Sequence, residues 1–121
     1  MTSLDHVIKT HQELCDEARE IIEQKGHDYN REQQHKGDTL HNITVCKELG
    51  IVDSVTQGLL VRLSDKMMRL ISLTKDPSVK NQVKDESVRD TIKDTINYLT
   101  YLYIKWDEVN HVDPPTWINK K

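Results

Sequence analysis

Three carboxylates follow one another at four-residue spacing in the last third of the chain. Glu86, Asp90 and Asp94 recur about one helical turn apart, and Asn97 and Tyr101 continue the same stripe. At about 100° per residue these five side chains fall within a sector of roughly 80°. Carboxylates in such a row repel one another unless a positive charge lies among them. The row therefore predicts either a bound cation or a facing set of basic side chains.

A hard divalent cation is the first chemistry that this row suits. Mg²⁺, with Mn²⁺ as the alternative, prefers oxygen ligands and is held by a few carboxylates, by waters and by substrate phosphates. One helix offers only a row, so a second helix must supply another acid, and Asp65 is the candidate. Three basic residues surround Asp65 on neighbouring turns, which suits a polyphosphate whose charge grows during cleavage. The predicted metal ligands are Asp65, Glu86, Asp90 and Asp94.

Catalysis and substrate binding are assigned to residues around this predicted metal site. Asp90 and Asp94 are the predicted catalytic residues. Residues 26–37 show no apolar period, and Tyr29 within them can stack on a base, although a plain connector fits the same composition equally well. The residues predicted to hold the substrate are Lys25, Asp28, Tyr29, Arg62, Lys66, Arg69, Asn97 and Tyr101.

The same residues are also compatible with arrangements that hold no ligand. The acidic row lies opposite an apolar stripe, so it fits a solvated face or direct ion pairs to the basic residues between Arg62 and Arg69. Asn97 and Tyr101 favour a site, because a solvated face more often carries Lys or Glu there. His35, His41 and Cys46 lack the tight spacing of a zinc site, and the chain has no glycine-rich phosphate loop of the Walker type.

The elements that must position these residues are helices. Apolar residues recur at three- and four-residue steps, and this periodicity predicts helices over residues 3–25, 38–49, 53–74 and 83–109, with Gly26 and Gly50 as stops. The stripe predicted to be buried in the last helix is Val88, Ile92, Ile96, Leu99, Tyr103 and Trp106. In the third helix it is Val55, Leu59, Leu60, Leu63, Met67, Leu70 and Ile71.

The predicted fold is all-α, a compact four-helix bundle-like domain with a long C-terminal helix. It is predicted as a single domain over residues 1–121, with residues 113–121 as a tail.

Composition limits the partners and the compartment that we expect. The chain has 121 residues, of which 36% are hydrophobic and 31% charged, and it has no Phe, so its own core is thin and a homo-oligomer (a dimer or a tetramer) is expected. A net charge of −3 makes nucleic acid an unlikely partner. No apolar run approaches the roughly 18 residues that a membrane-spanning helix requires, so the sequence predicts no membrane span. We expect a cytoplasmic protein, with Cys15 and Cys46 reduced.

Three stretches resemble a known family. They are Lys25-Gly26-His27-Asp28-Tyr29, Leu60–Leu70 with its Arg-x-x-Asp-Lys-x-x-Arg pattern, and Asp85–Tyr98. They resemble small phage and bacterial proteins described as nucleotide-modification-associated domains, which are similar to the MazG-like all-α NTP pyrophosphatases. The resemblance covers roughly residues 10–105 and is most specific in the last helix. It implies a nucleotide ligand or substrate and, for a phage protein, the host cytoplasm.

What the resemblance implies for the site differs between the two helices. In the MazG-like superfamily a Glu-Glu-x-x-Glu helix and a Glu-x-x-Asp helix hold Mg²⁺ ions that activate water to split an NTP into NMP and pyrophosphate. Asp94 best matches the acid that closes the second motif, with Asp90 or Glu86 as its partner. On the preceding helix Asp65 is the acid, while Arg62 and Lys66 stand where the superfamily has Glu; Glu17 and Glu20 of the first helix are alternative ligands.

Three functions are compatible with this pattern. The first is a Mg²⁺-dependent nucleotide pyrophosphohydrolase that acts on an NTP, a dNTP or a modified nucleotide. The second is a non-catalytic nucleotide-binding protein on the same scaffold, which sequesters a nucleotide such as a defence-signalling messenger. The third is a structural or regulatory helical oligomer whose charged stripes are interface bridges.

Overall fold

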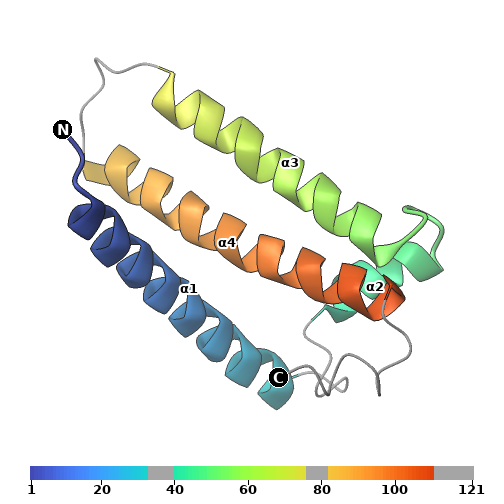
Figure 1. Cartoon of the computed structure of the whole chain (residues 1–121). Helices are drawn as coiled ribbons and strands as arrows, with labels where there is room; N and C mark the ends of the chain where they lie inside the picture. The colour runs from blue at the N-terminus through green and yellow to red at the C-terminus, as the bar shows by residue number, and fades with distance from the viewer. Residues whose placement is uncertain (33–39, 76–81, 111–121) are drawn as a thin grey trace.

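Four helices make up the parts of the chain that the structure describes (Figure 1). The computed structural model describes residues 1–32, 40–75 and 82–110, and side chains over 1–25, 40–75 and 87–110. The helices are α1 (Leu4–Glu32), α2 (His41–Glu48), α3 (Val55–Thr74) and α4 (Gln82–Asn110), and no strand occurs in these ranges. The all-α prediction with a long C-terminal helix is thus confirmed, and the arrangement is compatible with a helical bundle. None of the helices, over the described residues, combines the length and apolarity that crossing a membrane requires.

Serine side chains cap two of the helices where the sequence predicts a start. The His6 N–H donates to Ser3 Oγ at 3.2 Å, ahead of the first turn of α1. At the start of α3, the Gln57 N–H donates to Ser54 Oγ at 3.0 Å, and Ser54 has the extended backbone typical of an N-cap. Each bond satisfies an N–H group that has no partner within the helix, so each fixes where its helix begins.

Of the two predicted glycine stops, Gly50 is confirmed and Gly26 is wrong. Gly50 has φ +79°, its N–H donates to the Lys47 carbonyl oxygen at 3.0 Å, and the Ile51 N–H donates to the Cys46 carbonyl oxygen at 2.9 Å. These two bonds make a Schellman motif, which ends α2. The helix α1 instead continues through Gly26 to Glu32. A glycine inside a helix costs only about 1 kcal/mol, and no proline follows within those residues to end the helix.

Helix α4 lies in the centre, with α3 along one side and α1 along the other (Figure 1). It runs antiparallel to α3 and parallel to α1, and among the described residues α1 and α3 do not contact each other. Among the described elements α2 packs against α3 alone, and Gly58 makes the approach possible: a Cβ at Gly58 would lie 2.8 Å from Ile43 Cγ2. The three long helices therefore form a layer about α4, with α2 behind one end of it.

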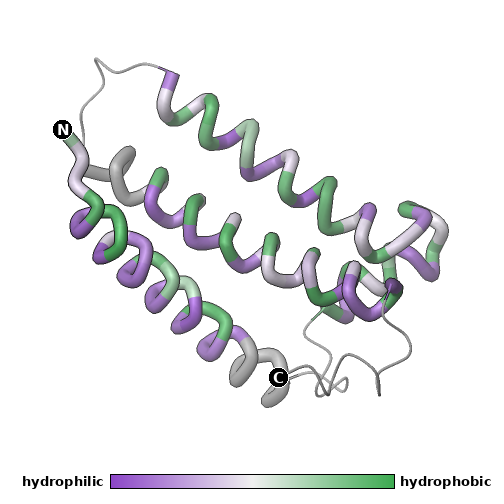
Figure 2. Tube along the Cα trace, in the orientation of Figure 1, coloured by the Kyte–Doolittle hydropathy of each residue, from purple (hydrophilic) through white to green (hydrophobic). Residues whose placement is uncertain are grey.

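The faces buried by this layer differ from those that the periodicity predicts. Leu59 and Leu63 of α3 are buried as predicted, but Leu60, Met67 and Ile71 of the same predicted stripe are exposed. On α4, the predicted residues Leu99, Tyr103 and Trp106 are exposed, whereas the polar residues Thr91 and Asn97 are buried. Figure 2 shows apolar and polar residues interleaved along each long helix. Because α4 has a neighbour on each side, its contacts fall on its flanks, and the apolar stripe between them is half-buried at Val88, Ile92 and Ile96 and exposed beyond them.

Candidate functional site

The seam between α3 and α4 holds an ion pair between a predicted phosphate-binding residue and a predicted catalytic residue. Lys66 Nζ lies 3.4 Å from Asp94 Oδ2, and both side chains keep about a third of their surface exposed, at 27% and 31%. The same ammonium lies 5.8 Å from the centre of the Tyr98 ring, within cation–π range. The acidic row therefore meets the basic stripe of α3 directly at Asp94, as one of the two sequence-based alternatives requires.

Arg69 makes the second polar contact of this seam. Its Nε donates to Thr91 Oγ1 at 3.1 Å, and Thr91 Oγ1 donates to the Ser87 carbonyl oxygen at 2.7 Å. Thr91 is buried, and this pair of bonds satisfies its hydroxyl as donor and acceptor. The other two members of the predicted α3 site, Arg62 and Asp65, are exposed to solvent. We call Arg62, Asp65, Lys66, Arg69, Asp90 and Asp94 the charged face.

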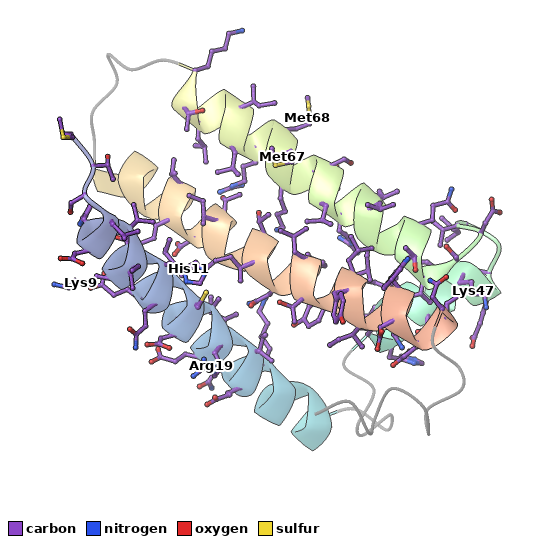
Figure 3. The ribbon with its side chains drawn as sticks, viewed as in Figure 1. Lys9, His11, Arg19, Lys47, Met67 and Met68 are labelled. Atoms are coloured by element: carbon purple, nitrogen blue, oxygen red, sulfur yellow. The ribbon has the colours of Figure 1, made fainter. Side chains whose placement is uncertain are left out.

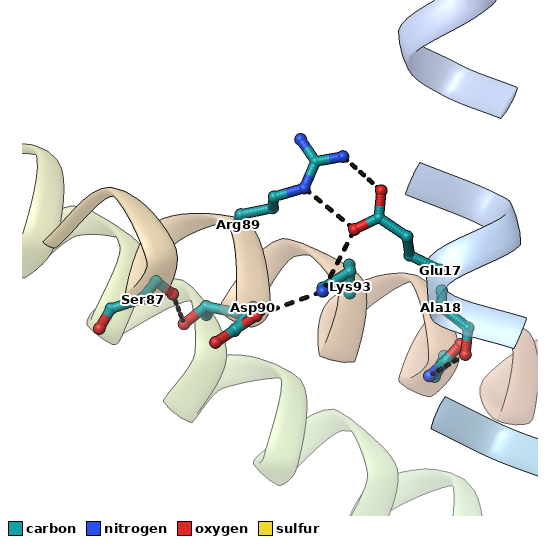
Figure 4. A network of polar contacts seen from close by, with 8 residues as sticks. Glu17, Ala18, Ser87, Arg89, Asp90 and Lys93 are labelled. Carbon is teal, nitrogen blue, oxygen red and sulfur yellow. Dashed lines mark hydrogen bonds and ion pairs between the residues drawn. The ribbon is translucent and has the colours of Figure 1, made fainter. Parts of the chain in front are cut away.

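A second charged cluster joins α4 to α1 (Figure 4). Arg89 donates to both carboxylate oxygens of Glu17, from Nε at 3.0 Å and from a terminal nitrogen. Lys93 Nζ lies 3.4 Å from Glu17 Oε1 and 3.3 Å from Asp90 Oδ1, so it bridges the two acids. The Lys93 side chain is mostly buried, whereas that of Asp90 is 68% exposed. The second predicted catalytic residue is thus paired within its own helix and open to water.

The cluster shifts the titration of Glu17. The hydrogen bond from Arg89, assisted by Lys93 and opposed by desolvation, lowers the pKa of the Glu17 carboxyl from its ordinary value of 4.5 to about 2. The same contact raises the pKa of Arg89. Folding therefore favours the ionised form of Glu17, and this acid stabilises the contact between α1 and α4 above pH 4.5.

We expect Glu17→Gln to destabilise the protein at pH 7 and to have little effect near pH 2. The folded state binds the Glu17 proton more weakly than the unfolded state does, so the stabilisation is lost as the pH falls from 4.5 through about 2. The measurement is the midpoint of thermal unfolding of the wild-type protein and the variant across this range. Glu20→Gln on the exposed side of α1 is the matched control. A difference between wild type and Glu17→Gln that is the same at pH 2 and pH 7 would contradict the assignment.

Asn97 and Tyr101, predicted to extend the substrate stripe, have packing contacts in the structure. The Asn97 side chain is buried, and its Nδ2 donates to the Ala18 carbonyl oxygen of α1 at 3.0 Å. The Tyr101 ring lies edge-on to Tyr98, with 5.7 Å between the ring centres. Asn97 therefore ties α4 to α1, on the opposite flank of α4 from Lys66.

The remaining predicted residues are only partly described. Lys25 is exposed near the C-terminal end of α1. Asp28 and Tyr29 belong to the last turns of α1, and Glu86 belongs to the second turn of α4, but their side chains lie outside the described residues. His35, which is one of residues 33–39, and the predicted tail 113–121 also lie outside the described residues.

Whether the charged face could hold a magnesium ion depends on how many carboxylates the ion needs as ligands. Among the residues whose side chains are described, no group of three or more His, Cys, Asp or Glu is placed to hold a metal ion. Asp65, Asp90 and Asp94 therefore do not form a cage of their own. Protein-bound Mg²⁺ commonly uses one or two carboxylates, several waters and the substrate phosphates, and Asp94 with Asp90 one turn away fits that smaller role. The magnesium and manganese assignments stay predictions.

Arg89 and Lys93 belong to the charged clusters but are not among the residues predicted from the sequence. They stand four residues apart on α4, and Lys93 also follows Asp90 by three residues, so a cationic stripe runs beside the acidic one. That spacing is a signal visible in the sequence. The partner is not, because Glu17 lies on α1, and only the packing of α1 on α4 brings the three side chains together.

No protein-family model matches the chain, and no curated protein or solved structure shows significant similarity to it. The resemblance to the MazG-like superfamily therefore rests on the three stretches of sequence alone.

Proposed function

We propose that this chain binds the polyphosphate of a nucleotide on its charged face and, with Mg²⁺, hydrolyses a nucleoside triphosphate to a monophosphate and pyrophosphate. In this reaction water adds to the α-phosphorus and the bond to the β-phosphate oxygen breaks, so pyrophosphate is the leaving group. The ligand class and the reaction come from the resemblance of the three sequence stretches. The observation that supports the charged face as the binding surface is the ion pair between Lys66 and Asp94.

The chemistry of that pair suits a metal–polyphosphate complex. An ammonium and a carboxylate that neutralise each other gain little from a phosphate or a metal ion arriving alone, because either one leaves the other partner unpaired. A magnesium polyphosphate brings both signs of charge, so Lys66 can move to a phosphate oxygen while Asp94 faces the ion. Both side chains are partly exposed, and the neighbouring Arg62 and Asp90 are open to solvent.

Binding without hydrolysis is the second candidate function. It is favoured by the absence of a three-acid group among the described side chains, since a pyrophosphohydrolase of this superfamily uses more carboxylates than Asp90 and Asp94 supply. Such a protein would sequester a nucleotide through the same basic residues. The two candidates share the binding surface and differ only in whether the ligand is returned intact.

The test is nucleotide binding and product release with and without Mg²⁺. We expect one of the common ribo- or deoxyribonucleoside triphosphates, or a cyclic nucleotide, to bind, with Mg²⁺ and triphosphate each strengthening the binding of the other. Lys66→Gln should weaken binding about 10- to 100-fold, as expected for loss of a charged hydrogen bond. Asp94→Asn should abolish the Mg²⁺ effect while sparing binding without Mg²⁺, because Lys66 is then free of its partner.

Lys105→Gln is the matched control for these variants. Lys105 forms a similar pair on α4, 3.1 Å from Glu108, near the end of the described helix. Binding and hydrolysis should be unchanged in this variant. Pyrophosphate release that stops in Asp90→Asn supports the enzyme, and recovery of the intact nucleotide supports the binding protein. Equal behaviour of Lys66→Gln and Lys105→Gln would refute the proposed surface.

A further inference from the structure

Lys93 stands between an acid of its own helix and an acid of a neighbouring helix (Figure 4). Its Nζ lies 3.3 Å from Asp90 Oδ1 and 3.4 Å from Glu17 Oε1. The side chain of Lys93 is 14% exposed, so water contributes little to balancing its charge and the two carboxylates contribute most of that balance. Lys93 therefore divides its charge between Asp90, which belongs to the charged face, and Glu17 of α1.

Glu17 is held beside this ammonium by Arg89. Its Oε1 accepts from Arg89 Nε at 3.0 Å as well as from Lys93 Nζ, and its second oxygen accepts from the same guanidinium. A guanidinium that donates to both oxygens fixes the orientation of a carboxylate. Figure 3 shows Lys9 and Arg19 on the side of α1 away from α4, so the cations that hold Glu17 come from α4. The packing of α1 on α4 thus sets an anion at a fixed place next to Lys93.

Asp90 differs from Glu17 in how open its carboxylate is. The Asp90 side chain is 68% exposed, whereas that of Glu17 is 34% exposed. Water screens the ion pair of Lys93 with Asp90 more strongly than the pair with Glu17, so the first pair is the weaker of the two. A cation that arrives from solvent can therefore displace Lys93 from Asp90, and the displaced ammonium still has Glu17 within reach.

We propose that Glu17 is a positioning residue for the charged face: it takes up the charge of Lys93 and so leaves Asp90 free to face a divalent cation. A doubly charged ion beside Asp90 repels the ammonium 3.3 Å from that carboxylate, and the ammonium then pairs with Glu17. Coupling between two contacts is reciprocal, so a cation at Asp90 also strengthens the contact of α1 with α4. The inference rests on the proposed function in one respect, namely that the charged face takes a divalent cation.

Glu17→Gln and Lys93→Gln should change the affinity for a divalent cation in opposite directions. In Glu17→Gln the ammonium of Lys93 keeps Asp90 as its partner, so the dissociation constant of Mn²⁺ alone should rise by about 3- to 5-fold. In Lys93→Gln the competing charge is gone, and the constant should fall by a similar factor. Both variants remove an ion pair between α1 and α4, so a purely structural role of that contact predicts the same direction for both. The measurement is a Mn²⁺ titration followed by water-proton relaxation.

A double variant separates an effect through Lys93 from a simple change in local charge. The charge of Glu17 acts on a nearby cation through space whether or not Lys93 is present. If Glu17 acts through Lys93, adding Glu17→Gln to the Lys93→Gln variant should change the Mn²⁺ dissociation constant by less than about 1.5-fold. Glu13→Gln is the matched control, because it removes the same charge from an exposed position one turn earlier on α1. Its Mn²⁺ affinity should equal that of the wild-type protein.

Amide hydrogen exchange tests the reciprocal effect in the unaltered chain. Saturating Mg²⁺ should slow exchange of the α1 amides around Glu17 by about 3- to 5-fold, the same factor as the change in cation affinity. The amides of α2 serve as the reference, because α2 packs on α3 and not on the cluster around Lys93. The slowing should be absent in Lys93→Gln. This measurement decides the matter if Glu17→Gln fails to fold.

The outcomes separate this inference from the proposed function. Opposite shifts of Mn²⁺ affinity in the two single variants, with no further effect in the double variant, support the inference whether or not a nucleotide binds. Shifts in the same direction, or an undiminished effect of Glu17→Gln in the double variant, would overturn the inference and leave nucleotide hydrolysis standing. So would α1 exchange that Mg²⁺ leaves unchanged. Mn²⁺ that binds neither the wild-type protein nor Lys93→Gln would overturn the inference together with the magnesium assignment, and nucleotide binding without metal would remain as the second candidate function.

Discussion

Leu59→Ala should lower the free energy of unfolding by about 3 kcal/mol, the largest loss that we expect from a single truncation in this chain. Leu59 is the largest fully buried side chain, with 0% of its surface exposed. It lies on α3 at about 40° around the helix from Leu63, the other buried residue of the predicted α3 stripe, so its truncation would leave a cavity in the core. Because few apolar residues are buried in the described part of the chain, few neighbouring side chains can shift to fill this cavity.

Chemical denaturation monitored by circular dichroism, at one fixed protein concentration, measures this loss. Leu49→Ala is the matched control because it makes the same substitution at a side chain that is 71% exposed. We expect its effect to stay within about 0.5 kcal/mol. Similar losses for the two variants would show that Leu59 is not the centre of the core.

Asn97→Asp is the second large effect, and its size depends on pH. Asn97 is only 5% exposed, and its amide donates to the Ala18 carbonyl oxygen. An ionised carboxylate has no proton to donate there and would be buried against an oxygen, which should cost about 3 kcal/mol at pH 7. Burial raises the pKa of the introduced carboxyl above its value in the unfolded chain. The loss should therefore diminish as the pH falls and the carboxyl protonates in the folded state.

Asn110→Asp supplies the control for this prediction. Asn110 makes the same kind of bond, from Nδ2 to the Trp106 carbonyl oxygen at 2.8 Å, at an exposed position on the same helix. We expect a loss below about 1 kcal/mol there and little dependence on pH. The free energies of unfolding at pH 7 and pH 4.5 are the quantities to compare, and a loss for Asn97→Asp that grows on acidification would contradict the buried contact.

The two pH effects run in opposite directions and separate two contacts between the same helices. The ionised Glu17 stabilises the contact of α1 with α4, and protonation removes that stabilisation. At Asn97 the introduced acid destabilises the contact, and protonation relieves it. Both act on the packing of α1 against α4, so a common detachment of α1 should accompany both losses.

Local features of this chain were predictable from the sequence because they depend on neighbouring residues alone. The caps at Ser3 and Ser54 and the Schellman stop at Gly50 use groups within a few positions of one another. The end of α3 at Thr74, and both ends of α4 to within one residue, also follow from periodicity. Gly26 shows the limit of such signals, since a glycine weakens a helix without forbidding it.

The candidate site was predictable only as a set of residue types. The spacing of Asp90 and Asp94 and of Lys66 and Arg69 indicated two charged stripes, and the structure pairs one residue of each. The spacing could not indicate that Lys93 lies between Asp90 and Glu17, because that contact depends on how α1 is rotated about its own axis when it packs on α4.

Residue types and their spacing along the chain were enough to establish that the protein is helical, where most of its helices start and stop, and which residues carry charge at helical spacing. Which sides of those helices face one another depends instead on how many neighbours each helix has. Helix α4 has a neighbour on each flank and buries Thr91 and Asn97 there. Leu99 and Tyr103, between the two flanks, are then left exposed, and the acidic row of Asp90 and Asp94 lies on the side of α4 away from them.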